Sequence, residues 1–261
     1  MRLVVEKMGV DALEIVVVNL ARSSERRRAM EQSLAPLGLP YSFFEAVDGR
    51  AGPHPLFAHY DEHKALTRRG IPLSAGELGC FASHYILWQR CVSQDRPILI
   101  CEDDIEIGPS FLEAYGIATG KISEYGLLRF SAHRSRRHTL CETVSRNLKI
   151  VRYERPVFGT SCYAISPQAA RKLLQTAETW FEPVDLHLDR FWTHNVPIRG
   201  FLPTPVHHAA DADEASEIRQ SSMPVKKTSQ YKVRRLAYKL WSEVRMSLHN
   251  LRYTGRWTSS N

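Results

Sequence analysis

Three consecutive carboxylates, Glu102-Asp103-Asp104, directly follow the apolar run Pro97–Cys101. Mutual repulsion and partial burial disfavour their ionised forms, so a compensating charge is expected beside them. Carboxylate oxygens suit Mg²⁺ or Mn²⁺. In extended backbone Glu102 and Asp104 point to one side and Asp103 to the other, so one face can hold a metal ion. A solvated acidic turn is the alternative interpretation.

A second pair of carboxylates, Asp185 and Asp189, lies four residues apart and would share one face of a helix. A carboxylate placed beside a reacting hydroxyl can take its proton as a general base. Asp185 is the first choice for that role and Asp189 the substitute. The alternative is a surface acid opposite Arg190, or a charge at a helix N-terminus.

Cationic and imidazole side chains form a third set of candidates. Arg22 and Arg27 flank the first strand–helix junction, where arginine and the helix N-terminus both attract anions. A solvated basic face is the alternative. His84 lies on a predicted helix, where a lone histidine is usually structural. Asp48-Gly49 is interpreted first as a turn in which glycine supplies a positive φ, with a ligand contact from Asp48 as a second possibility.

The elements that must position these residues indicate an α/β sheet. The run Ile15–Leu20 is apolar throughout, as in a strand covered on both faces. A helix from Ser23 or Ser24 and a strand over 41–47 complete a β-α-β unit, which favours parallel strands. A capping box at Ser74 and Glu77 begins another helix. Further strands are expected over 97–101, 125–130, 148–153, 158–165 and 198–206, with a basic loop over 133–138 and a helix over 167–176. Ligands of such sheets lie beyond the carboxyl ends of strands, where the acidic trio falls.

The formal net charge of the 261-residue chain is +7. From Pro224 onward nine Lys and Arg face one acid, so that segment carries +8 and the remainder −1. The five cysteines show no close pairing, and Cys80, Cys91 and Cys101 are interpreted as small core residues in a reducing compartment. Charges interrupt the first 14 residues, and no apolar run is long enough to span a bilayer, so a cytoplasmic protein is expected.

The sequence resembles the family 25 glycosyltransferases, which include lipooligosaccharide and collagen galactosyltransferases. The matching blocks occur in family order over about residues 15–206, and five in register are far more specific than any one. They are Val18-Asn-Leu-Ala-Arg-Ser-Ser-Glu-Arg-Arg27, Phe44-Glu-Ala-Val-Asp-Gly49, Leu73-Ser-Ala-Gly-Glu-Leu-Gly-Cys80 with Ser83-His84, Ile98-Leu-Ile-Cys-Glu-Asp-Asp-Ile105, and Gly159-Thr-Ser-Cys-Tyr-Ala-Ile-Ser-Pro-Gln-Ala-Ala-Arg171 followed by Pro183-Val-Asp185. Two positions depart from the pattern. Cys101 replaces a common Leu, Val or Phe, and Leu186 precedes His187 where many members place His directly after Asp, so no role is transferred to His187.

The resemblance implies one GT-A-like α/β domain over 1–210, with a central, mostly parallel sheet flanked by helices. It implies a UDP-sugar donor, often UDP-galactose, and a metal-binding role for the acidic trio. Mn²⁺ or Mg²⁺ there would bridge the two phosphates and neutralise the leaving diphosphate. The residues assigned to donor binding are Asn19, Arg22, Arg27, Asp48, His84, Glu102 and Asp103, and those assigned to the metal are Glu102, Asp104 and, by analogy with other transferases of that fold, His207.

For the reaction, the resemblance implies an inverting transfer of the sugar onto lipopolysaccharide or another glycan or lipid-linked acceptor. Asp185, or else Asp189, would take the proton of the acceptor hydroxyl. The transition state would resemble that of glycoside hydrolysis.

Residues 211–261 are expected to form a linker and a basic amphipathic tail. Its apolar stripe comprises Tyr231, Val233, Leu236, Leu240, Val244, Met246 and Leu248, with Trp241 nearby. Such a helix suits an anionic membrane surface, which would place the protein peripherally on the inner membrane. Packing of the stripe on the domain is the alternative.

Other functions remain open at this level. A metal-dependent phosphodiesterase would use the same carboxylates but needs further Asp and His ligands, for which only His207, His208 and Asp211 are obvious. A non-catalytic transferase relative is a third reading, disfavoured by the intact acidic trio. A nucleic-acid-binding module is disfavoured because the body is nearly neutral and carries no recognisable RNA or DNA motif.

Overall fold

The structure is a computed structural model that describes residues 12–208 and 229–253. Of the predicted linker and tail over 211–261, residues 211–228 (with Asp211) and 254–261 lie outside the described residues, as does the side chain of Tyr231. Within those ranges no helix is long and apolar enough to cross a bilayer.

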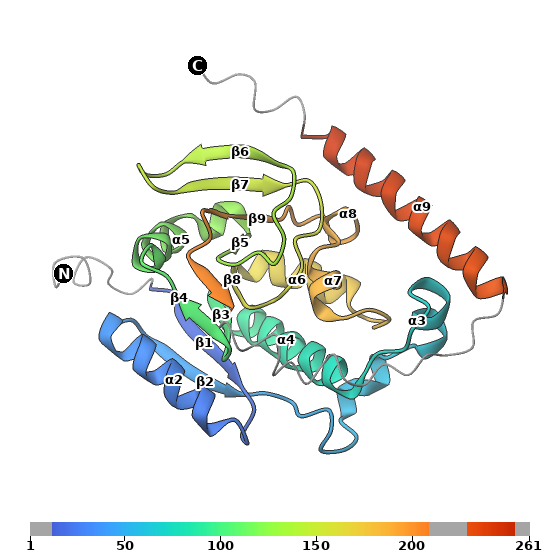
Figure 1. The fold of residues 1–261 in the computed structure, drawn as a ribbon, viewed down its shortest axis with the longest axis horizontal. Coiled ribbons are helices and arrows are strands. Elements are labelled where there is room, and N and C mark those ends of the chain that lie inside the picture. The colour runs from blue at the N-terminus through green and yellow to red at the C-terminus, as the bar shows by residue number, and fades with distance from the viewer. Residues whose placement is uncertain (1–11, 209–228, 254–261) are drawn as a thin grey trace.

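The centre of the molecule is an eight-stranded sheet with the order β2-β1-β3-β8-β5-β9-β7-β6 (Figure 1). Six strands run in one direction and β8 and β7 run against them, so the predicted mostly parallel sheet is confirmed. The strands are β1 (Glu14–Asn19), β2 (Tyr41–Glu45), β3 (Ile98–Glu102), β5 (Leu127–Arg129), β6 (His138–Thr143), β7 (Lys149–Tyr153), β8 (Cys162–Ile165) and β9 (Arg199–Leu202). A separate two-stranded sheet pairs β4 (Ile105–Ile107) with β10 (Val206–His208).

Helices cover both faces of the sheet, which explains why its inner strands are apolar throughout. On one face α2 (Ser24–Leu34) and α5 (Phe111–Tyr125) pack against alternate residues of β1 and β3, such as Val17 and Leu99. On the other face α4 (Ala75–Gln94) and α6 (Pro167–Thr176) pack against the intervening residues, such as Val16 and Ile100. The result is a three-layer α/β/α molecule.

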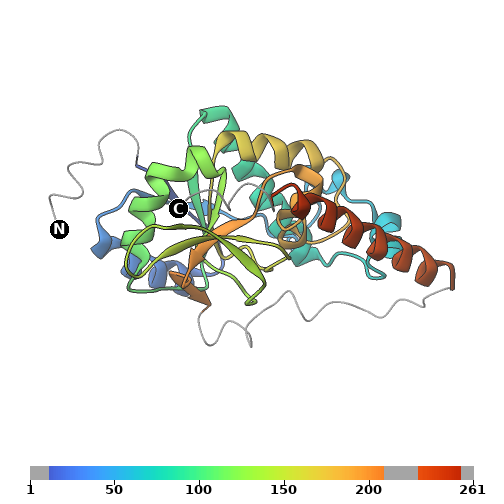
Figure 2. The same ribbon diagram turned by 90° about the horizontal axis from the view of Figure 1, so that it is seen from above.

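Shorter elements surround this core. They are the 3₁₀ turns η1 (Ala35–Leu37) and η2 (Pro55–His59) and the helices α3 (Glu62–Arg68), α7 (Val184–Leu188) and α8 (Phe191–His194). The long helix α9 (Ser229–Leu251) lies along one side of the molecule, next to α3 and α8 (Figures 1 and 2).

Several predicted elements are confirmed and three are corrected. The capping box is present, since the side chain of Ser74 accepts from the amide of Glu77 and the Glu77 carboxylate accepts from the amide of Ser74. The predicted strand over 158–165 is only β8, because Phe158 and Gly159 have positive φ values of 62° and 78° that no strand accommodates.

The predicted strand over 198–206 is split into β9 and β10, because the intervening Pro203 and Pro205 lack the amide hydrogens of a ladder. The predicted basic loop over 133–138 ends in a strand, β6, which pairs with β7 at the edge of the sheet.

Candidate active site

A cavity of about 320 Å³ opens at the carboxyl ends of β1 and β3. Its wall brings together predicted residues from four separate segments: Arg22, Asp48, His84, and the acidic trio of Glu102, Asp103 and Asp104. The edge of a parallel β-α-β unit is where ligands of α/β sheets bind. The structure therefore brings these predicted residues together at the edge of the sheet where the sequence analysis expects a site.

Asp103 and Asp104 form a turn directly after β3, so the extended backbone expected through the acidic trio ends at Glu102. Oδ2 of Asp103 accepts a hydrogen bond of 2.6 Å from the side-chain nitrogen Nδ2 of Asn19, at the end of β1. Arg26 on α2 lies 3.4 Å from Oδ1 of the same carboxylate. Burial raises the pKa of Asp103, and the bond from Asn19 and the charge of Arg26 oppose that rise. Asn19 thus reaches the site through Asp103.

Asp104 is the carboxylate most in need of a partner. Its Oδ1 is buried without a hydrogen-bond partner. Burial, added to the charges of Glu102 and Asp103, raises the pKa of Asp104 to about 7. A cation would satisfy the unpartnered oxygen and offset the repulsion, so Glu102 and Asp104 fit a hard divalent ion with oxygen ligands.

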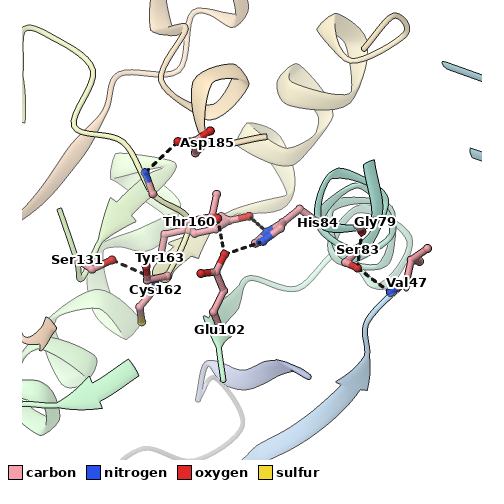
Figure 3. A network of polar contacts seen from close by, with 12 residues as sticks. Val47, Gly79, Ser83, His84, Glu102, Ser131, Thr160, Cys162, Tyr163 and Asp185 are labelled. Carbon is pink, nitrogen blue, oxygen red and sulfur yellow. Dashed lines mark hydrogen bonds and ion pairs between the residues drawn. The ribbon is translucent and has the colours of Figure 1, made fainter. Parts of the chain in front are cut away.

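Glu102 is held from two sides, as Figure 3 shows. The hydroxyl of Thr160 donates to its Oε1 over 2.5 Å, and Nε2 of His84 lies 3.6 Å from the same oxygen. Burial raises the pKa of Glu102, but His84 and Thr160 outweigh it and the net shift is downward. Glu102 is therefore the ionised anchor of the site, beside the harder-to-ionise Asp104.

The orientation of His84 follows from a chain of buried hydrogen bonds. Nε1 of Trp88 donates to the hydroxyl oxygen of Tyr163 over 2.9 Å, and that hydroxyl lies 2.8 Å from Nδ1 of His84. Among the described contacts of Tyr163, Nδ1 is the acceptor available to its hydroxyl proton. Neutral His84 therefore carries its own proton on Nε2, which faces Glu102 and the cavity.

This tautomer bears on a second set of potential ligands. Cys80, His84 and Glu102 offer three ligand atoms within 4.8 Å of one another, a mixed set that suits zinc. Coordination through Nε2 would require the proton of His84 to sit on Nδ1, which would leave the Tyr163 hydroxyl without its acceptor. Burial raises the pKa of the Cys80 thiol well above its usual value, with the Glu102 and Asp185 charges adding to the rise, which disfavours the thiolate that zinc requires. The oxygen pair of Glu102 and Asp104 is the better fit.

A buried ion pair between Arg129 and Asp189 holds the segment that precedes Thr160 in the chain. Nη2 of Arg129 lies 2.6 Å from Oδ1 of Asp189, and both side chains are almost fully buried. Asp189 Oδ2 accepts from the amide of Phe158, and Nη1 of Arg129 donates to the carbonyl of Gly159. These bonds stabilise the positive φ of Phe158, a strain of the kind found at functional sites.

The two predicted candidates for the general base therefore separate. Asp189 is 0% exposed and committed to Arg129, so the structure places it in the framework. Burial raises its pKa to about 6. Asp185 is half-buried, and its Oδ2 accepts from the amide of Gly159 over 3.3 Å. Of the two, Asp185 is the more exposed carboxylate, although it does not line the cavity.

His208, rather than the predicted His207, is the histidine of β10 that acts on the acidic trio. The two side chains of β10 point to opposite sides of the strand. Nε2 of His208 lies 2.6 Å from Oγ of Ser161, and its charge helps to lower the pKa of Glu102. His207 instead lies against Gly108.

Two further predictions are corrected. Arg27 pairs with Glu31 and stacks over Phe43 on the outside of α2, whereas Arg26 is the arginine that lines the cavity next to Arg22. The helical turn places adjacent residues about 100° apart, so only one of them can face the sheet edge. Cys80 packs against the core and also lines the cavity, while Cys91 and Cys101 are buried as predicted. All five cysteines are free.

Gly49 is required for a reason other than its predicted positive φ. A Cβ on Gly49 would lie 1.8 Å from the carbonyl oxygen of Ala75, and one on Gly79 would lie 2.4 Å from that of Val47. The Asp48 loop therefore rests directly on the backbone of α4. Asp48 in turn pairs with Arg22 across the cavity.

Sequence reasoning missed Arg26, Thr160, Arg129 and Tyr163. Thr160 and Tyr163 lie within the block that begins at Gly159, so the resemblance pointed to their segment but not to their contacts. Arg129 carried one signal, a lone charge at the end of an apolar strand. Nothing in the sequence distinguished Arg26 from its neighbours.

Comparison with known proteins identifies the family of the chain. The family model described as glycosyltransferase family 25 (LPS biosynthesis protein) matches residues 12–188. A "Glycosyltransferase 25 family member" of Aedes aegypti is 34% identical over 184 residues, covering 65% of this chain and 29% of the relative. The "Probable inactive glycosyltransferase 25 family member 3" of Rattus norvegicus is 27% identical, covering 83% and 42%. The "Lipooligosaccharide biosynthesis protein lic2B" of Haemophilus influenzae is 33% identical over 99 residues, covering 35% and 34%.

The structure is that of an α/β protein with an acidic, arginine-lined cavity at the carboxyl ends of β1 and β3. The chain belongs to glycosyltransferase family 25. It spans well under half the length of these relatives, between 29% and 42%.

Proposed function

We propose that this chain transfers a sugar from a UDP-sugar, with UDP-galactose as the first donor to test, to a hydroxyl of a glycan or lipid-linked acceptor. The carrying observation is the cavity whose lining combines Arg22 and Arg26 with Glu102 and with Asp104, whose Oδ1 lacks a hydrogen-bond partner. A nucleotide diphosphate with a divalent ion complements that mixture of charges. The same proposal assigns the fold to the GT-A type.

Glu102 and Asp104 would hold Mn²⁺ or Mg²⁺, and the ion, when bound, would neutralise charge on the leaving diphosphate. Arg22 and Arg26 lie beside the N-terminus of α2, where cationic side chains and unpaired amides together attract phosphate. Asp48 orients Arg22, and Asp103, held by Asn19, orients Arg26.

The acceptor side of the reaction is assigned to Asp185. As the acceptor oxygen forms its bond to the anomeric carbon and the bond to the diphosphate breaks, the hydroxyl proton passes to this carboxylate. The outcome would be inversion at the anomeric carbon. Asp185 lies on α7 outside the lining of the cavity, and the amide of Gly159 donates to its carboxylate next to the segment that carries Thr160 (Figure 3), which supports this choice.

A donor screen tests the proposal. Thermal shift and product analysis with UDP-, GDP- and CMP-sugars, each with and without Mn²⁺, should show stabilisation and turnover with a UDP-sugar and the metal. Arg26→Gln should weaken donor binding, whereas Arg27→Gln is the matched control from the outer face of the same helix.

A non-catalytic donor-binding protein is the second candidate, because the rat relative carries the name "Probable inactive". It would bind a UDP-sugar with Mn²⁺ but release no sugar to any acceptor or to water. Cleavage of phosphodiesters that carry no sugar would instead indicate a phosphodiesterase.

A further inference from the structure

Helix α9 is fixed to the body through one face. Met246 and His249 are 4% and 5% exposed, and the ring of Tyr238 packs edge-on against Phe181. Near the C-terminal end of the helix the Asn250 side chain accepts from Arg152 over 2.8 Å and donates to the carbonyl of Glu154. The helix is therefore held along its length in a defined rotation.

The opposite face of α9 is apolar and exposed. Seven of the ten exposed large hydrophobic side chains among the described residues lie on this helix. Six of them form a stripe with helical spacing: Val233 (68% exposed), Leu236 (59%), Leu240 (59%), Val244 (57%), Leu248 (54%) and Leu251 (64%). At about 100° and 1.5 Å per residue, the stripe is about 27 Å long and lies roughly opposite Tyr238 and His249. The alternative expectation, that the apolar stripe packs on the domain, is therefore wrong for these six residues. Met246, a predicted member of the stripe, instead belongs to the packed face.

Basic side chains flank the stripe on both sides. Lys232 and Lys239 lie on one flank, and Arg234 and Arg252 on the other, at helical angles next to the stripe. All four are exposed. Glu243, the acid of this helix, is turned to an ion pair with Arg155 at 3.2 Å. The outward surface of α9 is therefore apolar along its centre and cationic along its edges.

We propose that this face of α9 docks on an anionic lipid surface. An apolar stripe buried at the headgroup boundary, with lysine and arginine on its flanks, matches the charge of such a surface. Pairing with a second copy through the same stripe would bring basic flank against basic flank, so like charges disfavour it. The proposal does not depend on the proposed catalytic function, and the cavity residues take no part in it.

Sedimentation of the full chain with vesicles tests the proposal. Wild-type protein should bind vesicles of phosphatidylcholine with phosphatidylglycerol, bind phosphatidylcholine alone far more weakly, and lose binding as salt rises. The triple variant Leu236→Gln, Leu240→Gln, Val244→Gln should weaken binding at least about tenfold, because three apolar side chains no longer enter the lipid. All three side chains are exposed in the free protein, so their replacement should leave the fold intact. The double variant Lys232→Gln, Lys239→Gln should weaken binding to the anionic vesicles about fivefold per charge.

The matched control is Leu140→Gln, an exposed leucine on β6 that should bind vesicles like wild type. Equal binding of wild type to neutral and anionic vesicles, or unchanged binding by the triple variant, would overturn the proposal. So would a wild-type dimer in lipid-free analytical ultracentrifugation that the triple variant converts to a monomer, because the stripe would then belong to a second copy. Equal thermal unfolding midpoints for wild type and the variants would show that any loss of vesicle binding comes from the changed surface and not from unfolding.

Discussion

At the scale of single residues, the site divides its carboxylates by their surroundings. Glu102 is held ionised by His84 and Thr160, Oδ1 of Asp104 lacks a hydrogen-bond partner, and Asp103 accepts from Asn19. Asp185 and Asp189 are four residues apart, yet only Asp189 is sealed in an ion pair. Similar side chains close together thus have different tasks, which the surrounding packing determines.

Asp185→Asn should retain UDP-sugar binding and lower turnover by about 10²–10⁴, the usual contribution of a general base. The comparison variant is Asp189→Asn, which breaks a buried pair with Arg129 and should cost about 3–5 kcal/mol of stability. Turnover and donor affinity, measured for both, separate the two roles. Loss of donor affinity with intact turnover in Asp185→Asn would make Asp185 a binding residue.

The tautomer of His84 is a second residue-scale prediction. Because Tyr163 donates to Nδ1, neutral His84 should carry its proton on Nε2, as ¹⁵N NMR of the imidazole can determine. Tyr163→Phe removes that bond and should give a mixture of tautomers, while Trp88→Phe, one bond further away, should change the spectrum less. A wild-type protein with the proton on Nδ1 would refute the assignment and reopen the mixed ligand set of Cys80, His84 and Glu102.

At the scale of elements, the site depends on close approach of backbones. The loop that carries Asp48 rests on α4 where Gly49 meets Gly79, with no room for a Cβ on either. Such a contact fixes the distance between the Arg22–Asp48 pair and His84, which both line the cavity.

Gly79→Ala should therefore destabilise the protein by about 1–3 kcal/mol, as overpacking does, and weaken donor binding. Gly120 on α5 is the control, because a Cβ there meets nothing within 4 Å. Gly120→Ala should stabilise the protein by about 0.5–1 kcal/mol through helix propensity. Urea unfolding measures both changes, and a neutral Gly79→Ala would show that the loop can move away from α4.

The sequence predicted the elements whose signals are local. Capping at Ser74, the apolar strands β1 and β3, and the β-α-β start were readable because periodicity and caps depend on neighbouring residues. It could not show that Phe158 has a positive φ, since Arg129 and Asp189 impose that conformation from distant segments. The choice of Arg26 over Arg27, and of His208 over His207, depended on rotations of an element that tertiary packing sets.

At the scale of the whole molecule, buried histidines couple stability to pH. His187 lies among Phe81, Trp88 and His194, and burial lowers its pKa to about 4. Burial likewise lowers the pKa of His249 to about 4 and holds that of His194 well below its usual value. These side chains tie α7, α8 and α9 to the core in their neutral forms.

The sign of the effect follows from linkage. Between about pH 6.5 and 4 the unfolded chain protonates His187 while the folded protein does not, so the free energy of unfolding falls as pH falls. From about pH 7.5 to 5 the loss assigned to His187 is about 2 kcal/mol. In urea unfolding at both pH values, the free energy of unfolding of His187→Gln should fall by about 2 kcal/mol less than that of wild type. An equal drop in the variant would contradict the assignment.

The measurement that tests the central claim most directly is turnover of a UDP-sugar as Mn²⁺ is titrated into wild type, Asp104→Asn and Glu106→Gln. Glu106 is an exposed acid on β4, two residues from Asp104 and outside the wall of the cavity, so its variant controls for the loss of a nearby charge. Wild type and Glu106→Gln should be activated by Mn²⁺ and silenced by EDTA, and Asp104→Asn should lose about 10²-fold or more at saturating metal. Undiminished turnover by wild type in excess EDTA, or by Asp104→Asn, would contradict a metal-dependent transfer at this site.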